Sequence, residues 1–403
     1  MTKDTVIIAG GGPVGLITGL GLARAGVPVT IFERYPDLQD DPRAATVHPA
    51  TLELLAGYGM EEDVRKAGLV CPTFQHWDRA SGELIAEFDH GVLVDETAFP
   101  YVVQCEQFKI SRIALARLAE EPLATLRLGA EVTGFTQDET GVDVTVHAGA
   151  AEERHRVPWL VGSDGGRSTV RKAAGIAFKG FTFPEQFMVL TTPFDFEKHR
   201  GFSYRNYLSD PEEWANCFKV AHDGPPGLWR IVLPVDPEKG EAELLSDEAV
   251  QGKMQKFFPK PDPYEIVHRK LYTVHQRVAE TFRKGRVLLA GDASHANNPI
   301  GGMGLNGGIQ DGVNLADKLG RVCAGEGEEL LDLYDKQRRT IATDFVQRQT
   351  IENKKRLESR DQAARQENFR QLRAIASDPD RARVFVRRAA MLEAQRQAAA
   401  TVL

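Results

Sequence analysis

Apolar and polar positions alternate along the chain in a way that separates strand–turn–helix units from a region of short strands. The first unit starts with the apolar run 5–9, passes through a glycine-rich turn into an Ala/Leu/Gly helix, and reaches a second apolar run at 29–33. Short apolar runs bounded by glycine predict buried strands, and a helix between two of them predicts a βαβ unit. A helix is also expected around Pro49 to Gly59, and apolar residues at helical spacing predict another over 110–118.

Later segments follow different patterns. Strands are expected at 131–135 and 142–147, and the alternating, aromatic-rich pattern from Phe181 to about Ile266 predicts antiparallel strands. From Glu328 onward, apolar residues recur at helical intervals in a charged, Ala/Gln/Arg-rich background, which predicts solvated packing helices or a dimer contact rather than catalytic elements. We therefore expect an α/β domain made of residues 1–70, 105–180 and 267–345, a β-rich domain made of 71–104 and 181–266, and a C-terminal helical segment, 346–403.

The turn after the first strand reads Gly10-Gly11-Gly12-Pro13-Val14-Gly15. In a G-x-G-x-x-G turn, Gly10 permits the tight bend, Gly12 lets a pyrophosphate approach the backbone, and Gly15 lets the helix pack close to the strand. Glu33 follows Gly15 by 18 residues and suits a ribose 2′-hydroxyl. An acid at this place disfavours a 2′-phosphate, so the pattern predicts FAD or NAD rather than NADP.

A second strand–turn–helix unit lies far along the chain. The apolar run 286–290 ends at Gly291, and Asp292 follows where a carboxylate can bind a hydroxyl, most plausibly a ribityl hydroxyl of a flavin. The run 301–306, Gly-Gly-Met-Gly-Leu-Asn, lacks bulky side chains where a flat ring needs close backbone approach. The helix that follows offers free N–H groups and the positive end of its dipole. An ordinary turn with glycine caps is the alternative interpretation of this loop taken alone.

The bulk composition limits the classes of partner. With 50 basic and 57 acidic residues the net charge of the 403-residue chain is −7, which argues against nucleic acid. The apolar stretch near the N-terminus is interrupted by glycines, Pro13, Arg24 and Pro28, so no membrane span is expected. Four scattered cysteines suit a reducing cytoplasm, no signal peptide is expected, and neither cysteines nor histidines show metal-ligand spacing. We expect a monomer or homodimer without a metal.

Between the two glycine loops stands a third motif, Gly162-Ser163-Asp164-Gly165. The three motifs, in this order, resemble those of the class A FAD-dependent aromatic hydroxylases, the 4-hydroxybenzoate hydroxylase-like family. The resemblance implies a Rossmann-like FAD-binding domain of the glutathione reductase type, an inserted β-rich substrate domain and C-terminal helices. It also implies non-covalent FAD, NADH or NADPH as a transient reductant, and a small aromatic substrate that is hydroxylated with O2 through a flavin C4a-hydroperoxide.

The same resemblance implies functional residues. Tyr207, Pro299, His48 and Arg230 would be catalytic: Tyr207 draws the phenolic proton away, the Pro299 carbonyl borders the reaction site, His48 relays a proton, and Arg230 steadies flavin motion. Surface, capping or packing roles compete for several of these residues. The residues implied in FAD binding are Gly10, Gly12, Pro13, Gly15, Glu33, Arg34, Arg43, Gln104, Arg112, Asp164, Asp292, Gly302, Gly304, Leu305 and Asn306.

The resemblance also bears on the substrate. If Tyr207 occupies the place of the family's catalytic tyrosine, Phe218 and Val220 stand where 4-hydroxybenzoate hydroxylase carries a serine and an arginine that bind the substrate carboxylate. We then expect 4-hydroxybenzoate to be a poor substrate, and a larger or less acidic ring, a phenol or hydroxylated N-heterocycle, to fill an apolar pocket beside Phe218. The alternative is that Tyr207 is a packed strand residue. A flavin halogenase is disfavoured because no two tryptophans stand two apart; a reductase or a non-catalytic binding protein of this fold stays open.

Overall fold

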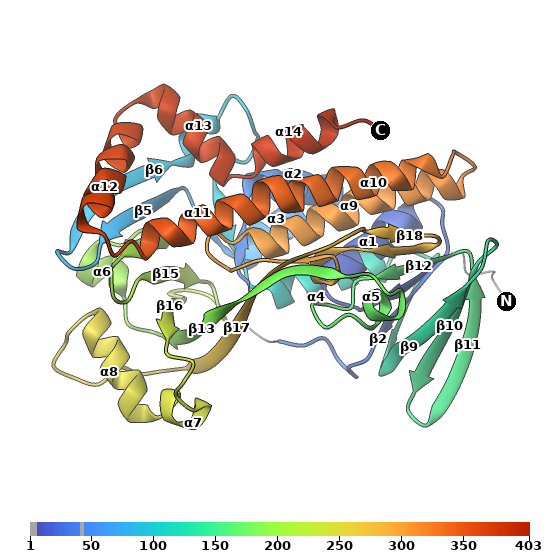
Figure 1. Cartoon of the computed structure of the whole chain (residues 1–403), viewed down its shortest axis with the longest axis horizontal. Coiled ribbons are helices and arrows are strands. Elements are labelled where there is room, and N and C mark those ends of the chain that lie inside the picture. Colours follow the sequence, from blue (N-terminus) through green and yellow to red (C-terminus); the bar gives the residue numbers. More distant parts are fainter. Residues whose placement is uncertain (1–5, 41–43) are drawn as a thin grey trace.

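The computed structural model describes residues 6–40 and 44–403. A six-stranded sheet with the order β18-β19-β12-β1-β2-β8 carries the first glycine loop (Figure 1). All of its pairings are parallel except β18 with β19. β1 is buried along its whole length, as expected for a parallel strand covered on both faces. Its strands are β1 (Val6–Ala9), β2 (Val29–Glu33), β8 (Ala124–Leu128), β12 (Trp159–Gly162), β18 (Arg283–Lys284) and β19 (Val287–Leu289).

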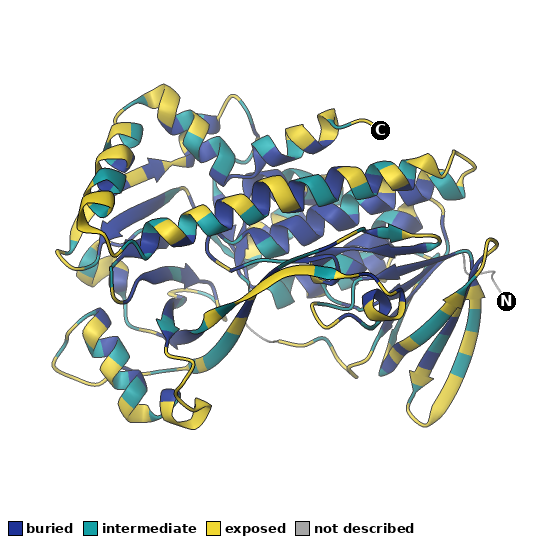
Figure 2. Cartoon of the chain, in the orientation of Figure 1, coloured by how far each residue is buried: buried dark blue, intermediate teal, exposed yellow. Residues whose placement is uncertain are grey.

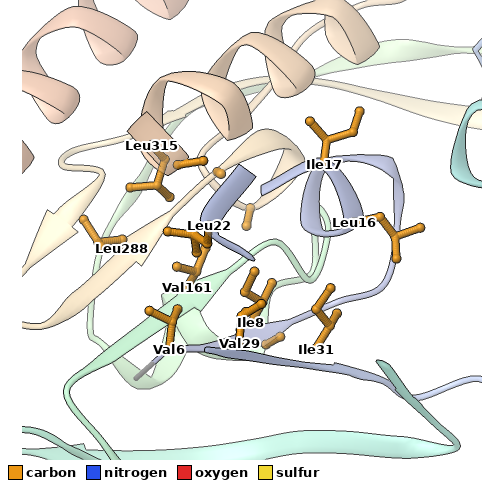
Figure 3. Close-up of a cluster of buried hydrophobic side chains, with 14 of the residues drawn as sticks. Val6, Ile8, Leu16, Ile17, Leu22, Val29, Ile31, Val161, Leu288 and Leu315 are labelled. Atoms are coloured by element: carbon orange, nitrogen blue, oxygen red, sulfur yellow. The ribbon is translucent and has the colours of Figure 1, made fainter. Parts of the chain in front are cut away.

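Helices α1 (Pro13–Arg24) and α9 (Met303–Cys323) pack on one another beside this sheet. Figure 3 shows the apolar cluster that joins the strands to the helices, with Ile8 and Val161 from the sheet and Leu315 from α9. The two helices approach closely because α9 presents glycines: a Cβ built on Gly308 would lie 2.8 Å from Val14 Cγ2. The helix–helix packing therefore fixes the start of α9 relative to the glycine turn before α1.

Other elements complete this part of the molecule. The antiparallel sheet β11-β10-β9 lies beside the six-stranded sheet, and a small sheet has the order β3-β7-β4. These elements are β3 (Thr46–Val47), α2 (Pro49–Gly57), α3 (Glu61–Ala67), β4 (Leu69–Cys71), β7 (Val102–Gln104), α4 (Gln107–Leu118), β9 (Ala130–Gln137), β10 (Val142–Ala148), β11 (Ala151–Val157) and α5 (Thr169–Ala173).

An eight-stranded sheet forms the second part, with the order β20-β17-β13-β16-β15-β14-β5-β6. Every pairing is antiparallel except that of β5 with β14. Its strands are β5 (Thr73–Asp78), β6 (Glu83–Asp89), β13 (Phe178–Thr192), β14 (Arg205–Ser209), β15 (Ala215–Val220), β16 (Leu228–Val235), β17 (His268–Ala279) and β20 (His295–Ala296). Strands β17 and β20 lie within a segment that we assigned to the first domain, and β13 begins in another such segment; the exact domain boundaries stay a prediction.

The expectation of strands alone between 181 and 266 is wrong for part of that stretch. The chain forms α6 (Phe196–Arg200), α7 (Glu241–Leu244) and α8 (Asp247–Phe257) there. In α8, Ser246 caps the N-terminus by accepting from the N–H of Ala249, and buried apolar residues recur three and four positions apart. This helical spacing of apolar residues was present in the sequence. It determined the structure of the segment, although proline and glycine residues stand on either side of it.

The C-terminal segment is helical, as expected, and its helices pack on the rest of the chain through one face while the other face is exposed. The helix that begins as α10 (Glu329–Thr340) continues through a π-helical turn, η3 (Ile341–Gln347), into α11 (Arg348–Leu357), followed by α12 (Gln362–Ala376), α13 (Pro379–Ala389) and α14 (Leu392–Ala400). The segment covers β6, η1 (His90–Leu93) and α2, and its inward faces are buried (Figure 2). Among the described residues no helix has the length and apolar character needed to cross a bilayer.

Candidate active site

The glycine turn after β1 has the shape that its sequence predicts. Gly10 has φ +102°, and a Cβ there would lie 2.5 Å from Ser163 O. A Cβ on Gly15 would lie 2.0 Å from Gly10 O, so the close packing of α1 on the turn requires glycine. At Gly12, by contrast, nothing lies within 4 Å of such a Cβ, and α1 starts at Pro13. The open space at Gly12, next to the free N–H groups of a helix N-terminus, fits a pyrophosphate.

Two carboxylates flank this space. Glu33 ends β2, and its Oε2 accepts a hydrogen bond from the N–H of Gly11 at 2.7 Å. Asp164 follows β12, and its Oδ2 accepts from the N–H groups of Thr169 and Val170 at the start of α5. The other oxygen of Asp164, Oδ1, is buried and has no hydrogen-bond partner among the described residues. A buried acceptor in this position fits a hydroxyl donor on a bound dinucleotide.

The second glycine loop holds the start of α9 against β3. Gly302 has φ +68°, and a Cβ there would lie 2.8 Å from Thr46 Cβ, so only glycine fits. Asn306 is fully buried; its Nδ2 donates to Thr46 O at 2.8 Å and its Oδ1 accepts from the N–H of His48 at 2.8 Å. Asn306 thus connects the start of α9 to the segment from Thr46 to His48 by hydrogen bonds. Leu305 beside it is 8% exposed. A Cβ built on Gly304, in the first turn of α9, would have, among the described residues, only the side chain of Asn297 within 4 Å outside its own helix.

Asp292 is exposed in η2 (Gly291–Ala293), the short turn that follows β19. The N–H of Gly291 donates to Asp311 Oδ2 at 3.0 Å, which ties this turn to α9. Arg171 donates to Ala293 O and thereby joins the same turn to the loop that carries Asp164. Three segments remote in sequence therefore meet at the carboxyl ends of the sheet strands, where α/β proteins bind nucleotides.

Gln104 is the best placed of the polar residues predicted from the family loops. It is fully buried on β7, its Oε1 accepts from Thr46 Oγ1 at 3.0 Å, and its Nε2 has no partner among the described residues. An unpaired buried amide donor fits a phosphate or nucleoside acceptor. The open space at Gly12, the unpaired oxygen of Asp164 and the unpaired amide of Gln104 are each features that a bound FAD would satisfy.

Two of the three arginines predicted to bind FAD lie at the surface. Arg112 on α4 pairs with Asp40 at 2.6 Å, and Arg34 donates to the hydroxyl of Tyr35 at 3.1 Å. Both side chains are exposed. Arg43 lies outside the described residues. The roles of these three arginines stay predictions.

A cavity lies between the eight-stranded sheet, the start of α9 and the C-terminal helices. Its volume of about 30 Å³ holds one or two waters, so a ring enters only after side chains rearrange. Tyr207 lies here, 8% exposed, with its ring stacked on His76 at 5.1 Å between centres. The residues that line the cavity are Phe74, His76, Arg205, Tyr207, Gly301, Met303, Gln349, Asn353, Arg356, Leu357, Phe385 and Ala389.

Comparison with known proteins identifies the chemistry of this arrangement. Residues 3–349 match the protein family described as "FAD binding domain". The para-nitrophenol 4-monooxygenase of Pseudomonas sp. (strain WBC-3) is 37% identical over 353 residues, which cover 86% of this chain and 85% of that protein. The chain belongs to the FAD-dependent aromatic hydroxylases. The predicted family, α/β fold and FAD cofactor are confirmed.

Two further relatives span nearly the whole of this hydroxylase. The 6-hydroxy-3-succinoylpyridine 3-monooxygenase HspB of Pseudomonas putida (strain DSM 28022 / S16) is 33% identical over 392 residues, 96% of this chain and 97% of that protein. The crystal structure of p-nitrophenol 4-monooxygenase PnpA from Pseudomonas putida DLL-E4 superimposes with a TM-score of 0.92 at 33% identity and covers 99% of both chains. The relatives are monooxygenases, so the enzyme class is shown and the halogenase and non-catalytic alternatives are set aside.

The cavity at Tyr207 differs from the apolar pocket beside Phe218 that we expected, because arginines line it and Phe218 does not. Phe218 and Val220 do lie on β15, but neither lines the cavity. Arg205, which pairs with Phe218 across the strands, lies two residues before Tyr207 and therefore on the same face of β14. Its Nε and Nη2 donate to the Tyr207 hydroxyl at 2.9 and 2.6 Å, and Nη2 also donates to Gly301 O at 3.0 Å. Period-two alternation around Tyr207 was the signal that could have revealed this arginine.

His48 is fully buried before α2 rather than at the surface. Burial, then the charge of Arg205, holds its pKa well below the usual value, so the ring is neutral near pH 7. Its Nε2 lies 2.8 Å from Gly301 O, which can only accept, so Nε2 carries the hydrogen. Nδ1 is then a bare acceptor, and no described residue donates to it.

Pro299 and Arg230 stand outside the residues that line the cavity. Pro299 is exposed, and its carbonyl accepts from the N–H of Gly302 at 3.0 Å. Arg230 is buried on β16, with its guanidinium 5.6 Å from the ring centre of Phe218. Their catalytic roles stay predictions. Among the described residues, no group of three or more histidine, cysteine, aspartate or glutamate side chains is arranged to hold a metal ion.

Sequence reasoning missed the contribution of the C-terminal helices to the cavity. Gln349, Asn353 and Arg356 reach it from α11, and Phe385 reaches it from α13. Gln349, Asn353 and Arg356 recur at three- to four-residue spacing, which places them on one face of α11. Nothing in that pattern distinguishes a cavity wall from an ordinary packed face.

Proposed function

We propose that this enzyme hydroxylates a phenol or a hydroxylated N-heterocycle in the cavity beside Tyr207. When bound, FAD supplies the redox chemistry that takes electrons from NADH or NADPH and activates O2. The observation that carries the proposal is the Arg205–Tyr207 pair beside Gly301, because it offers hydrogen-bond donors to a phenolic oxygen next to the start of α9. The substrates in the names of the two relatives, a nitrophenol and a hydroxypyridine, belong to these two chemical classes.

The protein's own residues then have three tasks. Arg205 and the Tyr207 hydroxyl stabilise the phenolate, whose ring is a better nucleophile than that of the neutral phenol. The bare Nδ1 of His48 can accept a hydrogen bond, because burial keeps the ring neutral and the Gly301 carbonyl fixes its tautomer. The small cavity leaves room for few waters, which would limit the loss of the oxidising equivalent as hydrogen peroxide when FAD is bound.

The test uses enzyme loaded with FAD. 4-Nitrophenol, unsubstituted phenol, hydroxypyridines and benzene are added in turn, and NADH or NADPH oxidation, O2 uptake and product mass are measured. We expect the hydroxylated rings, and not benzene, to accelerate reductant oxidation and to gain one oxygen atom from O2. Reductant oxidation that no ring accelerates would instead indicate a reductase, and a product that requires halide a halogenase.

Two finer expectations belong to the same proposal. A monomer or homodimer is expected, and light scattering of the FAD-loaded enzyme measures this directly. A cytoplasmic location is expected from the four scattered cysteines, none of which is in a disulfide. Fractionation of the source cells would test the location.

A further inference from the structure

The cavity contains a second guanidinium that the chemistry at Tyr207 does not use. Arg356 lies on α11 and lines the cavity together with Arg205. Among the described residues, no hydrogen bond or ion pair includes its side chain, and its guanidinium carbon lies 6.0 Å from the ring centre of Phe385. The carboxylate of Glu352, one turn earlier, is 3.9 Å from Arg388 Nη2. The charge of Glu352 acts on Arg356 from one turn away, but no carboxylate of a described residue forms an ion pair with its guanidinium, so its hydrogen-bond donors at the cavity wall are available to a ligand.

The cavity as a whole is cationic. Its lining includes Arg205 and Arg356 but no aspartate or glutamate. Arg205 is 6% exposed, and its Nη1 has no hydrogen-bond partner among the described residues. Leaving such a donor unpaired in the interior costs free energy, as does a charge without a counter-ion. A ligand that brings negative charge would remove both penalties.

Both guanidiniums act on the same side chain. Burial, then the charge of Arg356, then that of Arg205, lowers the pKa of His76 to about 3. His76 stacks on Tyr207, so the two positive charges lie within electrostatic reach of the place where the ring hydroxyl of a substrate would bind. Burial also lowers the pKa of Arg356 itself.

We propose that the substrate is an aromatic acid whose carboxylate binds Arg356 while its ring hydroxyl meets Tyr207 and Arg205. This inference rests on the proposed function and names the substrate class of the same site. Guanidinium and carboxylate groups match in a two-point geometry, and the pair is strongest where water is excluded. Arg356 then determines specificity through a helix outside the sheet, which is why a comparison limited to β15 finds no carboxylate partner.

The first experiment compares ligands on the unmodified, FAD-loaded enzyme. Binding of 4-hydroxybenzoate and 3-(3-hydroxyphenyl)propionate is measured by calorimetry against the matching carboxamides, which have the same shape without the charge. We expect each acid to bind about 10- to 100-fold more tightly than its amide, the range for losing a charge-assisted contact. Equal binding of acid and amide for both pairs would overturn the proposal.

The second experiment assigns the effect to Arg356. Arg356→Gln should abolish the preference for the acid while the affinity for the amide changes less than about twofold, and Arg356→Lys should restore part of the preference. Lys355→Gln removes an exposed charge from the same helix and should change neither affinity. A preference for the acid that persists in Arg356→Gln would show that another group binds the carboxylate.

Failure of this inference and failure of the proposed function are distinguishable. If uncharged phenols are hydroxylated and acids are not bound, the hydroxylase function stands and the role of Arg356 is rejected. If acids bind through Arg356 but no ring accelerates reductant oxidation, the binding site stands and the proposed reaction is rejected.

Discussion

The guanidinium of Arg205 donates two hydrogen bonds to the hydroxyl oxygen of Tyr207, from Nε at 2.9 Å and from Nη2 at 2.6 Å. These two donors engage the oxygen as an acceptor, so its own proton is left to donate to a group in the cavity. Nη2 also donates to Gly301 O, which joins the tyrosine to the loop before α9. The hydroxyl is thus fixed in position relative to the region that fits FAD.

Replacing Tyr207 by phenylalanine should slow hydroxylation by about 100-fold, the lower part of the range for removing a positioned proton-transfer group. Reductant would still be consumed, because the FAD cradle is untouched, and more of the oxygen should appear as hydrogen peroxide. The measurement is the ratio of hydroxylated product to NADH or NADPH oxidised, together with peroxide release. Tyr204→Phe is a matched control, since Tyr204 does not line the cavity. Loss of FAD from Tyr207→Phe would contradict this assignment.

Gly12→Val should weaken FAD binding without unfolding the protein. A Cβ at Gly12 meets no atom within 4 Å, and its φ of −71° is accessible to any residue, so the FAD-free protein tolerates the side chain. The branched side chain would occupy the space that the pyrophosphate needs. We expect an unchanged melting temperature without FAD and at least about a tenfold rise in the FAD dissociation constant, measured by fluorescence quenching.

Gly15→Val provides the contrast. Its Cβ would lie 2.0 Å from Gly10 O, so this variant should lower the melting temperature even without FAD. If Gly12→Val lost stability to the same extent, the space at Gly12 would not be a ligand site.

The glycine loops of the FAD-binding domain could be predicted from the sequence because the backbone conformations that they require are local. Gly10, Gly15 and Gly302 are dictated by backbone conformation or close approach within a short segment, and such constraints leave a fixed spacing. Asp164 and Asn306 were likewise predicted from their motifs, and their roles in FAD binding stay predictions. Their hydrogen bonds to backbone groups depend on the fold.

The residues that line the cavity could be predicted only in part from the sequence, because they come from segments that lie far apart in the chain. His76 reaches Tyr207 through the parallel pairing of β5 with β14, which no local pattern encodes. Arg356 reaches it because the helix from α10 to α11 continues past the FAD domain and lies across the β-rich part. Tertiary packing, not helical periodicity, decides which face of such a helix meets a ligand.

Acid should destabilise the enzyme through its buried histidines. Burial is the largest cause that lowers the pKa of His76 to about 3 and that of His90 to about 4. Below the unfolded pKa of about 6.5 the unfolded chain binds protons that the folded protein does not, so stability falls as the pH drops. Between pH 6.5 and pH 4 each imidazole should remove about 1.4 kcal/mol per pH unit. Chemical denaturation at pH 7.5 and pH 5.5 measures this loss.

His90→Asn should reduce that pH dependence. His90 Nδ1 lies 2.8 Å from Pro72 O, and the asparagine amide can donate to the same carbonyl without a group that titrates. His147→Gln, at an exposed position on β10, is the control and should leave the dependence unchanged. An unaltered pH dependence in His90→Asn would show that other groups govern acid unfolding.

The last prediction concerns the buried network behind Asp292. Asp311 accepts from Arg338 Nε at 2.6 Å and lies 2.7 Å from His295 Nε2. Burial alone would raise the pKa of Asp311, but the charges and hydrogen bonds of His295 and Arg338 outweigh it and keep the pKa low. Asp311 Oδ2 also accepts from the N–H of Gly291, so this carboxylate positions the turn that carries Asp292.

Arg338→Leu should therefore destabilise the fold by about 3–5 kcal/mol, because it leaves a buried carboxylate with too few partners. FAD affinity should fall as well, since Asp311 would no longer be held against the turn at Gly291. Arg339→Leu removes a neighbouring arginine whose side chain is 40% exposed in its pair with Asp335, and such surface pairs contribute about 0–1 kcal/mol. Urea unfolding and FAD titration of both variants separate the two cases. Equal losses in both would show that the charge of this helix, and not the contact with Asp311, stabilises the turn.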